Sequence, residues 1–283
     1  MSDLRNRNRR RWGIIYSPMI GALKPMKRWR EIREYIEEKK VAYDFFCASD
    51  AAVVESKALE YANDGYDTVV VIGGDGALQD ALNGVMASDR AEEVALGIIP
   101  NGIANDFATY WGLSSQNYKA AVDSIVAGRV RKVDVGCCSY HAGECEVKRY
   151  FLNVLNVGMS ANIVALANKK CTIFAKIIYR VRALLHLLFR RQNFSMRFRL
   201  NNQVVEKKFM MLSIGNSTGY GMTPSAVPYN GWLDVSVVYR PELMQLFQGL
   251  WLLVRGRLLN AKVVKPYRTR KVKILRAQNA AIS

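Results

Sequence analysis

The stretch VVVIGGDGALQDALNGV, residues 69–85, decides how the first half of the chain folds. Its consecutive β-branched residues predict a strand with both faces covered, as in a parallel sheet between helices. Gly73, Gly74, Asp75 and Gly76 follow the strand, and a helical pattern of apolar residues begins directly after them. The stretch therefore predicts a strand, a tight glycine turn and a helix that starts at the turn.

Alternating strand and helix patterns surround this stretch. Asp50 is placed to cap a helix from Ala51 to about Asn63, and residues 26–40 form an amphipathic helical pattern. The apolar face of the latter consists of Trp29, Ile32, Tyr35 and Ile36. The strand patterns of this half are WGIIYS, VAYDFFCAS, DTVVVI and ALGIIP. Such alternation predicts an α/β fold on a parallel sheet.

Beyond residue 130 the pattern changes to strands joined by short turns. The strand patterns there are KVDVGCCSY, RYFLNVLNV, FSMRFRL, VVEKKFMMLSI and WLDVSVVY. Helical patterns interrupt them near residues 162–190 and 241–258. We therefore predict two domains: an α/β domain over residues 1–130 and a mainly antiparallel β-sandwich over residues 131–283. The exposed strands expected in the second domain offer an edge through which a homodimer could form.

The positive charge of the chain limits the classes of partner that it is expected to bind. Its 283 residues carry a formal charge of +17 and its pI is near 9.8, which favours nucleotides, nucleic acid or an anionic membrane. The longest apolar run, LMQLFQGLWLLV at residues 243–254, is too short to span a membrane. The basic N-terminus lacks the apolar region of a signal peptide. We therefore expect a cytoplasmic protein.

The cysteines are five in number and scattered, which does not suggest a disulfide framework. Cys137, Cys138, His141 and Cys145 lie within CCSYHAGEC, a cluster that invites a zinc site. Its spacing matches no familiar zinc pattern, and adjacent cysteines on a strand point to opposite faces. A hairpin with buried thiols is the interpretation that we favour over a metal site.

The glycine turn at residues 73–76 lies where a strand of the predicted sheet ends, which is where open α/β sheets bind ligands. Glycine lets the backbone approach a phosphate, and the first N–H groups of a helix attract anions. Asp75 would repel a bare phosphate, so the turn suits a nucleotide whose phosphates are bridged to Asp75 by Mg²⁺. The competing interpretation is an ordinary turn with a helix-capping aspartate.

A second loop repeats this design in LGIIPNGIANDFATYWGL, residues 96–113. A strand ends near Pro100, a turn passes through Gly102, and Asn105 and Asp106 begin a helix. Because neighbouring parallel strands end at the same edge of a sheet, the two loops can face one metal–nucleotide site.

Both loops resemble the signature loops of the diacylglycerol kinase catalytic-domain family, which is related in fold to the NAD kinases. FLNVLNVGMSANI (151–163) and GNSTGYGMTPSAVPYNGWLDVSVV (215–238) resemble second-domain motifs of that family. The resemblance covers nearly the whole chain. It implies a nucleotide-binding α/β domain, a C-terminal β-sandwich and a cleft between them for ATP and a lipid hydroxyl. The implied activity is ATP-dependent phosphorylation of diacylglycerol or a related membrane lipid.

The resemblance also implies roles for individual residues. Asp75 and Asp106 would be catalytic and would contribute to the Mg²⁺ environment. Asn105 would support the second loop. The residues that would bind ATP are Gly73, Gly74, Asp75, Gly76, Ala77, Leu78, Gln79, Gly102, Ile103 and Asn105.

The chain departs from the family pattern in both loops. Ala77 and Ile103 stand where the family has threonines, so two hydroxyls that face the nucleotide are missing. Each lost hydrogen bond costs about 0.5–1.5 kcal/mol, which nucleotide binding can survive. Asp80 stands where the family usually has glutamate.

Further departures lie in the second half. Bacterial relatives hold a structural Mg²⁺ through an Asp-Gly turn, whereas this chain has Asn230–Gly231, with Val227 and Trp232 supplying the neighbouring carbonyls. Asparagine is a weaker ligand for a hard cation. The family's general base belongs to an Asp-Gly-Glu motif, and the sequence reaches KVKILRAQNAAIS without one. Either the sequence stops short of the motif, or the protein lacks the base and is a poor or inactive kinase.

Basic residues concentrate at residues 5–11, 169–191 and 255–274. The middle segment combines helical apolar spacing with lysines and arginines, which suits a helix lying on an anionic membrane and equally a core helix with a basic edge. We expect a lipid kinase that associates peripherally with the membrane. The alternatives are a kinase-like protein that binds nucleotide or membrane without turnover, and a nucleic-acid-binding protein. The absence of any familiar nucleic-acid-binding motif speaks against the last.

Overall fold

The structure, a computed structural model, describes most of the chain and divides it into two compact units. The first unit comprises Met1–Lys132 and Cys137–Phe151, and the second Val133–Gly136 and Leu152–Ser283. The predicted boundary near residue 130 lies close to the first of these divisions, whereas the return of residues 137–151 to the first unit was not predicted. The described residues are 11–18, 25–102, 105–158, 194–201, 203–218, 222–239, 242, 244–245, 248, 251–252, 258–277, 280 and 282.

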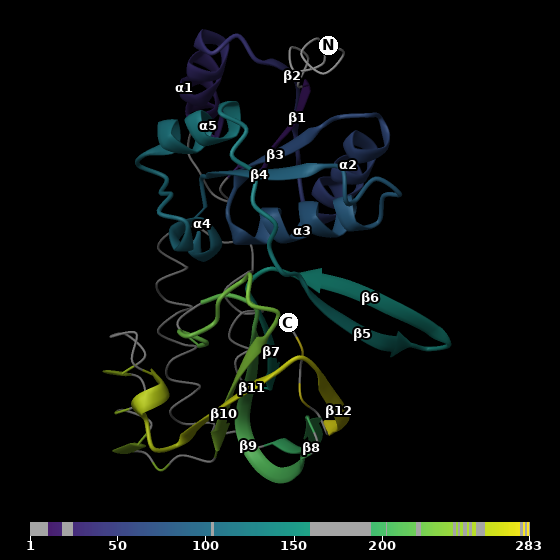
Figure 1. Cartoon of the computed structure of the whole chain (residues 1–283), viewed down its shortest axis with the longest axis vertical. Coiled ribbons are helices and arrows are strands. Elements are labelled where there is room, and N and C mark those ends of the chain that lie inside the picture. Colours follow the sequence, from purple (N-terminus) through teal and green to yellow (C-terminus); the bar gives the residue numbers. More distant parts are fainter. Residues whose placement is uncertain are drawn as a thin grey trace. The chain divides into compact units, whose positions relative to one another are not determined.

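A parallel sheet of four strands forms the centre of the first unit (Figure 1). Its order is β2-β1-β3-β4. The strands are β1 Arg11–Tyr16, β2 Ala42–Cys47, β3 Thr68–Gly73 and β4 Ala95–Pro100. Gly73 lies beside Pro100 and Tyr16 beside Ile72, so β1, β3 and β4 end together at one edge of the sheet, which we call the carboxyl edge.

The described residues of this unit form the helices α1 Pro25–Glu38, α2 Ala51–Asn63, α3 Asp75–Met86, α4 Asp106–Tyr110 and α5 Tyr118–Val126. The predicted N-cap of α2 is confirmed, because the carboxylate of Asp50 accepts a hydrogen bond of 3.1 Å from the backbone N–H of Val53. The parallel α/β fold predicted from the strand–helix alternation is therefore present.

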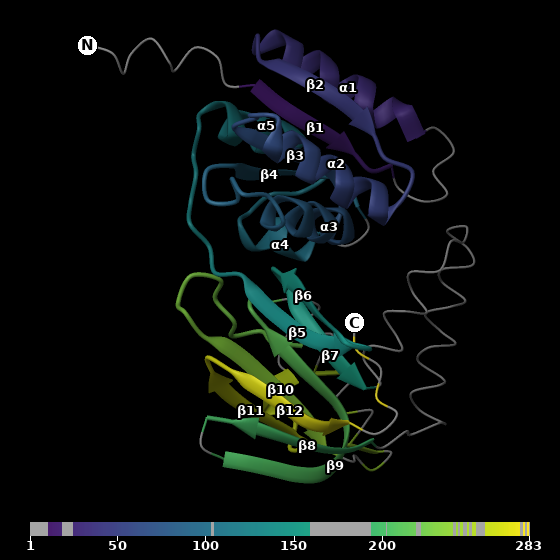
Figure 2. The same cartoon turned by 90° about the vertical axis from the view of Figure 1, so that its right-hand side faces the viewer.

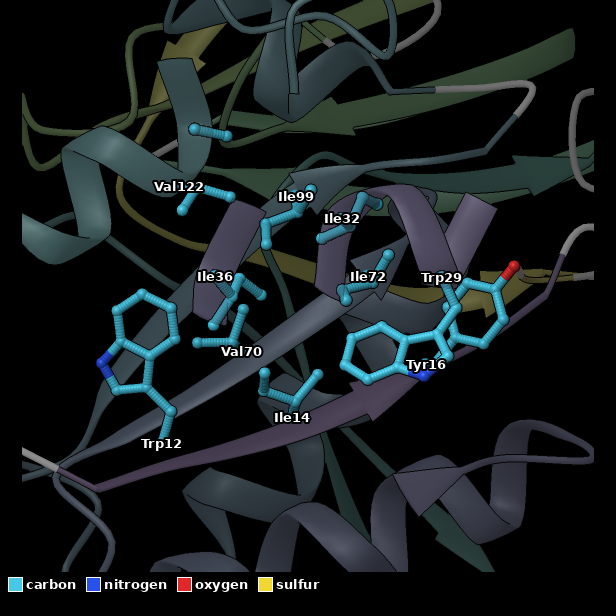
Figure 3. Packing of buried hydrophobic residues seen from close by; sticks show 11 residues of the cluster. Trp12, Ile14, Tyr16, Trp29, Ile32, Ile36, Val70, Ile72, Ile99 and Val122 are labelled. Atoms are coloured by element: carbon cyan, nitrogen blue, oxygen red, sulfur yellow. The ribbon is translucent and has the colours of Figure 1, made fainter. Parts of the chain in front are cut away.

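One face of the sheet packs against α1 and α5. Figure 3 shows the apolar cluster between them, in which β1 contributes every second residue as its pleat requires. The buried members are Trp12, Ile14, Tyr16, Trp29, Ile32, Ile36, Val70, Ile72, Ile99, Ala121 and Val122. The apolar face predicted for α1 is thus confirmed, except that Tyr35 is only partly buried.

Helices α2 and α3 pack closely against each other, and α2 also packs against the sheet. A Cβ on Gly13 of β1 would lie 2.4 Å from the ring of Tyr61, so the tyrosine of α2 occupies the space above this glycine. Similarly, a Cβ on Gly84 of α3 would lie 2.1 Å from the carbonyl oxygen of Glu55. Glycine at these two positions therefore lets α2 come closer to β1 and to α3 than a residue with a Cβ would allow.

The strand order creates a switch point between β1 and β3. From β1 the chain adds β2 on one side and then crosses to add β3 on the other. The helices that follow the two strands therefore cover opposite faces of the sheet, and a switch point of this kind is where open α/β sheets generally bind ligands. The glycine turn after β3 begins at this point.

A hairpin of β5 Gly136–Ala142 and β6 Cys145–Phe151 follows the sheet. Its turn contains Gly143 with φ of +67°. The predicted hairpin is confirmed, but the prediction of buried thiols is wrong for Cys137 and Cys145, which are exposed, whereas Cys138 on the opposite face is partly buried. Within the described part of the chain, no group of three His, Cys, Asp or Glu side chains could hold a metal ion.

The second unit is built on an antiparallel sheet (Figure 2). Its strands run in the order β11-β10-β9-β8-β12, and β7 also pairs with β9. The predicted antiparallel second domain is therefore confirmed. The elements are β7 Val154–Gly158, β8 Phe194–Leu200, β9 Gln203–Gly215, β10 Leu233–Tyr239, the short 3₁₀ helix η2 Leu258–Asn260, β11 Val264–Thr269 and β12 Val272–Ala277.

Some predictions differ from the structure or lie beyond it. The pattern RYFLNVLNV does not form one strand but divides between β6 and β7, which belong to different units. The helical pattern at 162–190 lies outside the described residues, and so does most of the one at 241–258. No helix in the described part is long and apolar enough to cross a membrane.

Candidate functional site

The two predicted loops lie side by side at the carboxyl edge. The first leaves β3 through Gly73 and Gly74 into α3, and the second leaves β4 through Asn101 and Gly102 into α4. The backbone N–H of Asn101 donates a hydrogen bond of 2.7 Å to the carbonyl of Gly73. This bond continues the pairing of the two strands into the loops and sets the loops next to each other.

The carboxylate of Asp75 joins the two loops. It accepts hydrogen bonds from the backbone N–H groups of Asp106, at 2.7 Å, and Phe107, at 3.2 Å. Asp75 is only 8% exposed. Asp75 therefore caps the first turn of α4, a different helix from the one it begins.

This contact places Asp106 next to Asp75. The N–H groups of α4 offset part of the charge of Asp75, which is how a buried carboxylate avoids the cost of desolvation. Each carboxylate oxygen can accept more than one hydrogen bond or ligand, so the cap leaves Asp75 able to contact a cation. Asp106 itself is half-buried at the start of α4.

Asn105 closes the second loop on itself. Its side-chain amide donates to the carbonyl of Gly102 at 2.7 Å, and its side-chain oxygen accepts from the N–H of Gly102 at 3.1 Å. The neighbouring Ile103 lies outside the described residues. The loop is thus held by its own asparagine, and its contact with a nucleotide stays a prediction.

The glycines at the start of α3 differ in what surrounds them. A Cβ on Gly73 would lie 2.9 Å from the Cβ of Ala77, so packing within the turn requires that glycine. A Cβ on Gly76 would meet no atom within 4 Å. Gly74 is the N-cap of α3 and has no side chain to satisfy the first N–H groups of the helix. The turn therefore leaves open space above a helix N-terminus, which suits an anion.

The next residues of α3 use their side chains for the fold. Leu78 is buried. The side-chain amide of Gln79 donates to the backbone carbonyl of Tyr150 on β6. The predicted nucleotide contacts of Leu78 and Gln79 therefore stay predictions that concern their backbone groups.

Asn83 fastens the hairpin to α3. Its side-chain oxygen accepts from the N–H of Tyr150 at 2.9 Å, and its amide donates to the carbonyl of Tyr150 at 3.0 Å. The same amide donates to the carbonyl of Gln79 at 2.9 Å. The buried side chain of Asn83 thus satisfies the backbone N–H and carbonyl of Tyr150, as a neighbouring strand would. These bonds attach β6 to the helix that begins at the glycine turn.

Tyr16 marks the end of β1 at the switch point. Burial raises the pKa of its hydroxyl, and a hydrogen bond with the side chain of Asn101 opposes that rise by a smaller amount. The tyrosine therefore stays neutral and links the end of β1 to the second loop.

A charged cluster lies one turn along α3 from this site. Arg149 of β6 makes two hydrogen bonds with the carboxylate of Glu55 on α2, at 2.6 and 2.8 Å. Burial, and to a smaller extent the negative charge of Glu55, raise the pKa of Asp80 to about 6, and Arg149 opposes this rise. In the sequence, Asp80 stood out only as a departure from a family pattern. Its charged surroundings could not be predicted, because Glu55 of α2 and Arg149 of β6 come close to it only in the tertiary fold.

Asp80 makes stability depend on pH. The pKa of its native carboxyl lies above the 3.8 of an ordinary aspartate, so the folded state binds more protons between these values and the free energy of unfolding falls as pH rises through them. We expect Asp80→Asn to raise the free energy of unfolding at pH 8 by about 1–2 kcal/mol and to leave it nearly unchanged near pH 4. Urea denaturation at the two pH values measures the difference.

Asp123 offers a control of opposite sign. A hydrogen bond from Lys39 holds the pKa of this exposed carboxyl below its usual value, so Asp123→Asn should lower stability at pH 8 and not raise it. Equal effects of Asp80→Asn at both pH values would contradict the assignment of a destabilising charge at position 80.

In the second unit, the turn predicted to hold a structural Mg²⁺ contains hydrogen bonds of its own. The side-chain oxygen of Asn230 accepts from the N–H of Trp232 at 2.9 Å, and the carbonyl of Val227 accepts from the N–H of Tyr229 at 2.8 Å. Gly231 has φ of +72°. A neutral amide is a poor ligand for Mg²⁺, and the metal here stays a prediction.

Asp134 lies against this turn and was not singled out from the sequence. Its carboxylate accepts a hydrogen bond of 2.6 Å from the N–H of Gly231, and its N–H donates to the carbonyl of Pro228 at 2.7 Å. The side chain of Asn216 in turn binds the carbonyl of Asp134 at 2.7 Å. No local pattern around residue 134 signals these contacts, because its partners lie more than eighty residues away.

Comparison with known proteins agrees with this architecture. Residues 11–138 match the model of the diacylglycerol kinase catalytic domain, and residues 153–283 match the YegS C-terminal NAD kinase β-sandwich-like domain. The chain belongs to the diacylglycerol kinase catalytic-domain family. This places both signature loops within the matched catalytic domain and confirms the family predicted from them.

Curated relatives in this family carry the name diacylglycerol kinase. The one from Staphylococcus carnosus (strain TM300) is 26% identical over 256 residues, which cover 88% of this chain and 79% of the relative. The one from Bacillus subtilis (strain 168) is 22% identical over 269 residues, covering 92% and 84%. A solved diacylglycerol kinase structure from Bacillus anthracis str. Sterne has a TM-score of 0.71 at 18% identity and covers 97% of this chain and 89% of that one, which supports the fold.

Proposed function

We propose that the protein is an ATP- and Mg²⁺-dependent lipid kinase that phosphorylates a hydroxyl of diacylglycerol or a related membrane lipid. The observation that carries this proposal is the carboxylate of Asp75, which binds the first turn of α4 and so joins the two loops at the carboxyl edge. Kinases of this family use ATP. The loops supply what phosphoryl transfer needs: backbone N–H groups for phosphates and carboxylates for a cation.

Each loop has a distinct part in this mechanism. Gly76, where a Cβ would meet no atom within 4 Å, would let triphosphate oxygens approach the N-terminus of α3, and Gly74 at the N-cap leaves the first N–H groups of the helix without a side-chain cap. Asp75 and Asp106 would hold Mg²⁺, directly or through water, and Asn105 fixes the backbone from which Asp106 extends. When bound, Mg²⁺ neutralises charge on the transferring phosphoryl group. The remaining contribution of the protein is to position the γ-phosphate for the lipid hydroxyl.

Phosphorylation of lipid tests the proposal directly. The protein is incubated with γ-labelled ATP, Mg²⁺ and detergent micelles that contain diacylglycerol, and the lipid fraction is separated. We expect labelled phosphatidic acid that depends on Mg²⁺. Binding of Mg·ATP with no labelled product from diacylglycerol, ceramide or sphingosine would contradict the proposal.

That outcome would favour a second candidate, a kinase-like protein that binds nucleotide or membrane without turnover. Ala77 and Ile103 lack the hydroxyls that the family pattern has in the two loops. Each lost hydrogen bond to the nucleotide costs about 0.5–1.5 kcal/mol without preventing nucleotide binding. The label in the lipid, measured beside the affinity for Mg·ATP, separates the two candidates.

Gly76 offers a test of the nucleotide site that does not depend on turnover. Since a Cβ at this position meets no protein atom, Gly76→Ala should leave the melting temperature unchanged or raise it through better helix propensity. If phosphates approach the backbone here, the same methyl group should weaken binding of Mg·ATP by about tenfold or more. Isothermal titration gives the affinity and thermal unfolding the stability. Unchanged affinity would show that the phosphates bind elsewhere.

A further inference from the structure

One face of the sheet in the second unit carries an unusual concentration of positive charge. In β8 the side chains alternate between buried and exposed positions, so Phe194, Met196, Phe198 and Leu200 line the core and Arg197 and Arg199 lie on the outer face. Strand partners share a face, which extends the outer face onto β12 and onto residues 203–208 of β9. We call it the basic sheet face; its cations are Arg197, Arg199, Lys208, Lys273 and Arg276.

The pairing register sets like charges directly against each other. Lys273 of β12 pairs with Arg199 of β8, and Arg276 pairs with Arg197. Like charges in opposite positions destabilise an antiparallel pair. Among the described residues of these strand segments, Glu206 is the one carboxylate, and it lies 3.6 Å from Arg197. Glu206 therefore offsets part of the charge of Arg197, and the pair of Arg199 and Lys273 is the one that works most against the sheet, which is understandable if an anionic partner binds it.

Apolar side chains are exposed among these cations. The register of β12 shifts between Ile274 and Arg276, so Leu275 is the extra residue of a β-bulge. It is 39% exposed, and Val204, which pairs with Arg199, is 45% exposed. Exposed apolar side chains next to lysines and arginines suit a partner that presents both negative charge and hydrocarbon.

We propose that the basic sheet face docks the protein on an anionic membrane, where its substrate lies. The choice of a lipid surface rests on the proposed function. A membrane presents phosphates to the lysines and arginines and hydrocarbon to Val204 and Leu275. A single-stranded nucleic acid is less suitable, because sheets that bind it stack bases on aromatic side chains, and the exposed positions of these strand segments are not aromatic. Figure 2 shows the three strands that form the face.

The experiment removes one like-charged pair. Arg199→Gln with Lys273→Gln neutralises two opposite cations and should keep or raise the melting temperature, since their repulsion is relieved. Binding is measured by sedimentation with vesicles of phosphatidylcholine, with and without phosphatidylglycerol. We expect the parent protein to bind the anionic vesicles and the double variant to bind them about ten- to thirtyfold more weakly. Arg129→Gln with Lys132→Gln removes two exposed cations of the first unit and should have a much smaller effect.

The readouts separate this inference from the proposed function. Phosphorylation of diacylglycerol by the Arg199→Gln, Lys273→Gln variant should equal that of the parent in detergent micelles and fall only on anionic vesicles. If the parent phosphorylates no lipid but its vesicle binding still depends on the pair, the docking face stands and the kinase proposal fails. Equal vesicle binding by the parent and the double variant would overturn the docking face. So would binding of single-stranded DNA through this pair in the absence of vesicle binding.

Discussion

Replacing Asp75 with alanine is expected to reduce lipid phosphorylation by about a hundred- to a thousandfold in kcat/KM, the scale of removing a preorganised electrostatic group from an active site. Two contacts are lost at once. The first turn of α4 loses the acceptor of its Asp106 and Phe107 N–H groups, and the nucleotide site that we propose would lose a carboxylate for its cation. Initial rates with Mg·ATP and diacylglycerol micelles measure the effect, and thermal unfolding shows whether the fold is kept.

Asp75→Asn separates the two roles. Its side-chain oxygen can still accept a hydrogen bond from α4, so the variant should recover most of the stability that alanine loses, which is about 1–3 kcal/mol. It should not recover the rate, because the negative charge that we propose holds the cation would be gone. Activity of the alanine variant within a factor of ten of the parent, or full activity of the asparagine variant, would contradict the role given to this carboxylate.

The largest effect on stability is expected from Gly84→Ala. The new Cβ would lie 2.1 Å from the carbonyl oxygen of Glu55, an atom of the α2 backbone that cannot turn aside as a flexible side chain can. Helices α2 and α3 must therefore separate, at a cost of about 2–4 kcal/mol. Urea denaturation measures the loss.

Gly76→Ala is the matched control, because the same change in the same helix meets open space. Alanine there should gain up to about 1 kcal/mol in helix propensity. A loss at position 84 smaller than about 0.5 kcal/mol would mean that the two helices do not approach each other as closely as the structure shows.

Local sequence patterns predicted the frame of the first unit well. The run of β-branched residues before Gly73 forms β3 in the middle of the sheet, and α3 begins at Asp75, as the glycine turn suggested. Asp50 caps α2 as predicted. These features succeed because strand periodicity, glycine turns and N-caps depend on residues close in sequence.

The contacts that build the candidate site join residues far apart in the sequence, so local sequence patterns could not predict them. The sequence suggested that Asp75 caps a helix, but the helix is α4, which begins thirty-one residues later. In the sequence, Asn83 looks like an ordinary polar residue of a helix. In the structure, its side chain makes two hydrogen bonds with the backbone of Tyr150, in the way that a neighbouring strand would. Gly84 gives no local sign of the α2 backbone that requires it.

The hairpin of β5 and β6 also shows what local sequence can and cannot predict. CCSYHAGEC has the pattern of a strand pair, which the structure confirms, but whether its thiols are buried depends on what packs over them. Similarly, RYFLNVLNV is continuous in sequence but its two halves belong to different units. Periodicity identifies a strand and one buried face, and the tertiary fold decides which neighbour buries it.

Hydrogen exchange of the backbone amides, with and without Mg·ATP, is the sharpest test of a nucleotide site at the carboxyl edge, because it locates the nucleotide independently of turnover. We expect Mg·ATP to slow exchange at residues 73–77, where α3 begins, and at residues 105–107, where Asp75 meets α4. Mg·ATP that binds but leaves both segments unchanged, with protection confined to another part of the chain, would contradict a nucleotide site at the carboxyl edge.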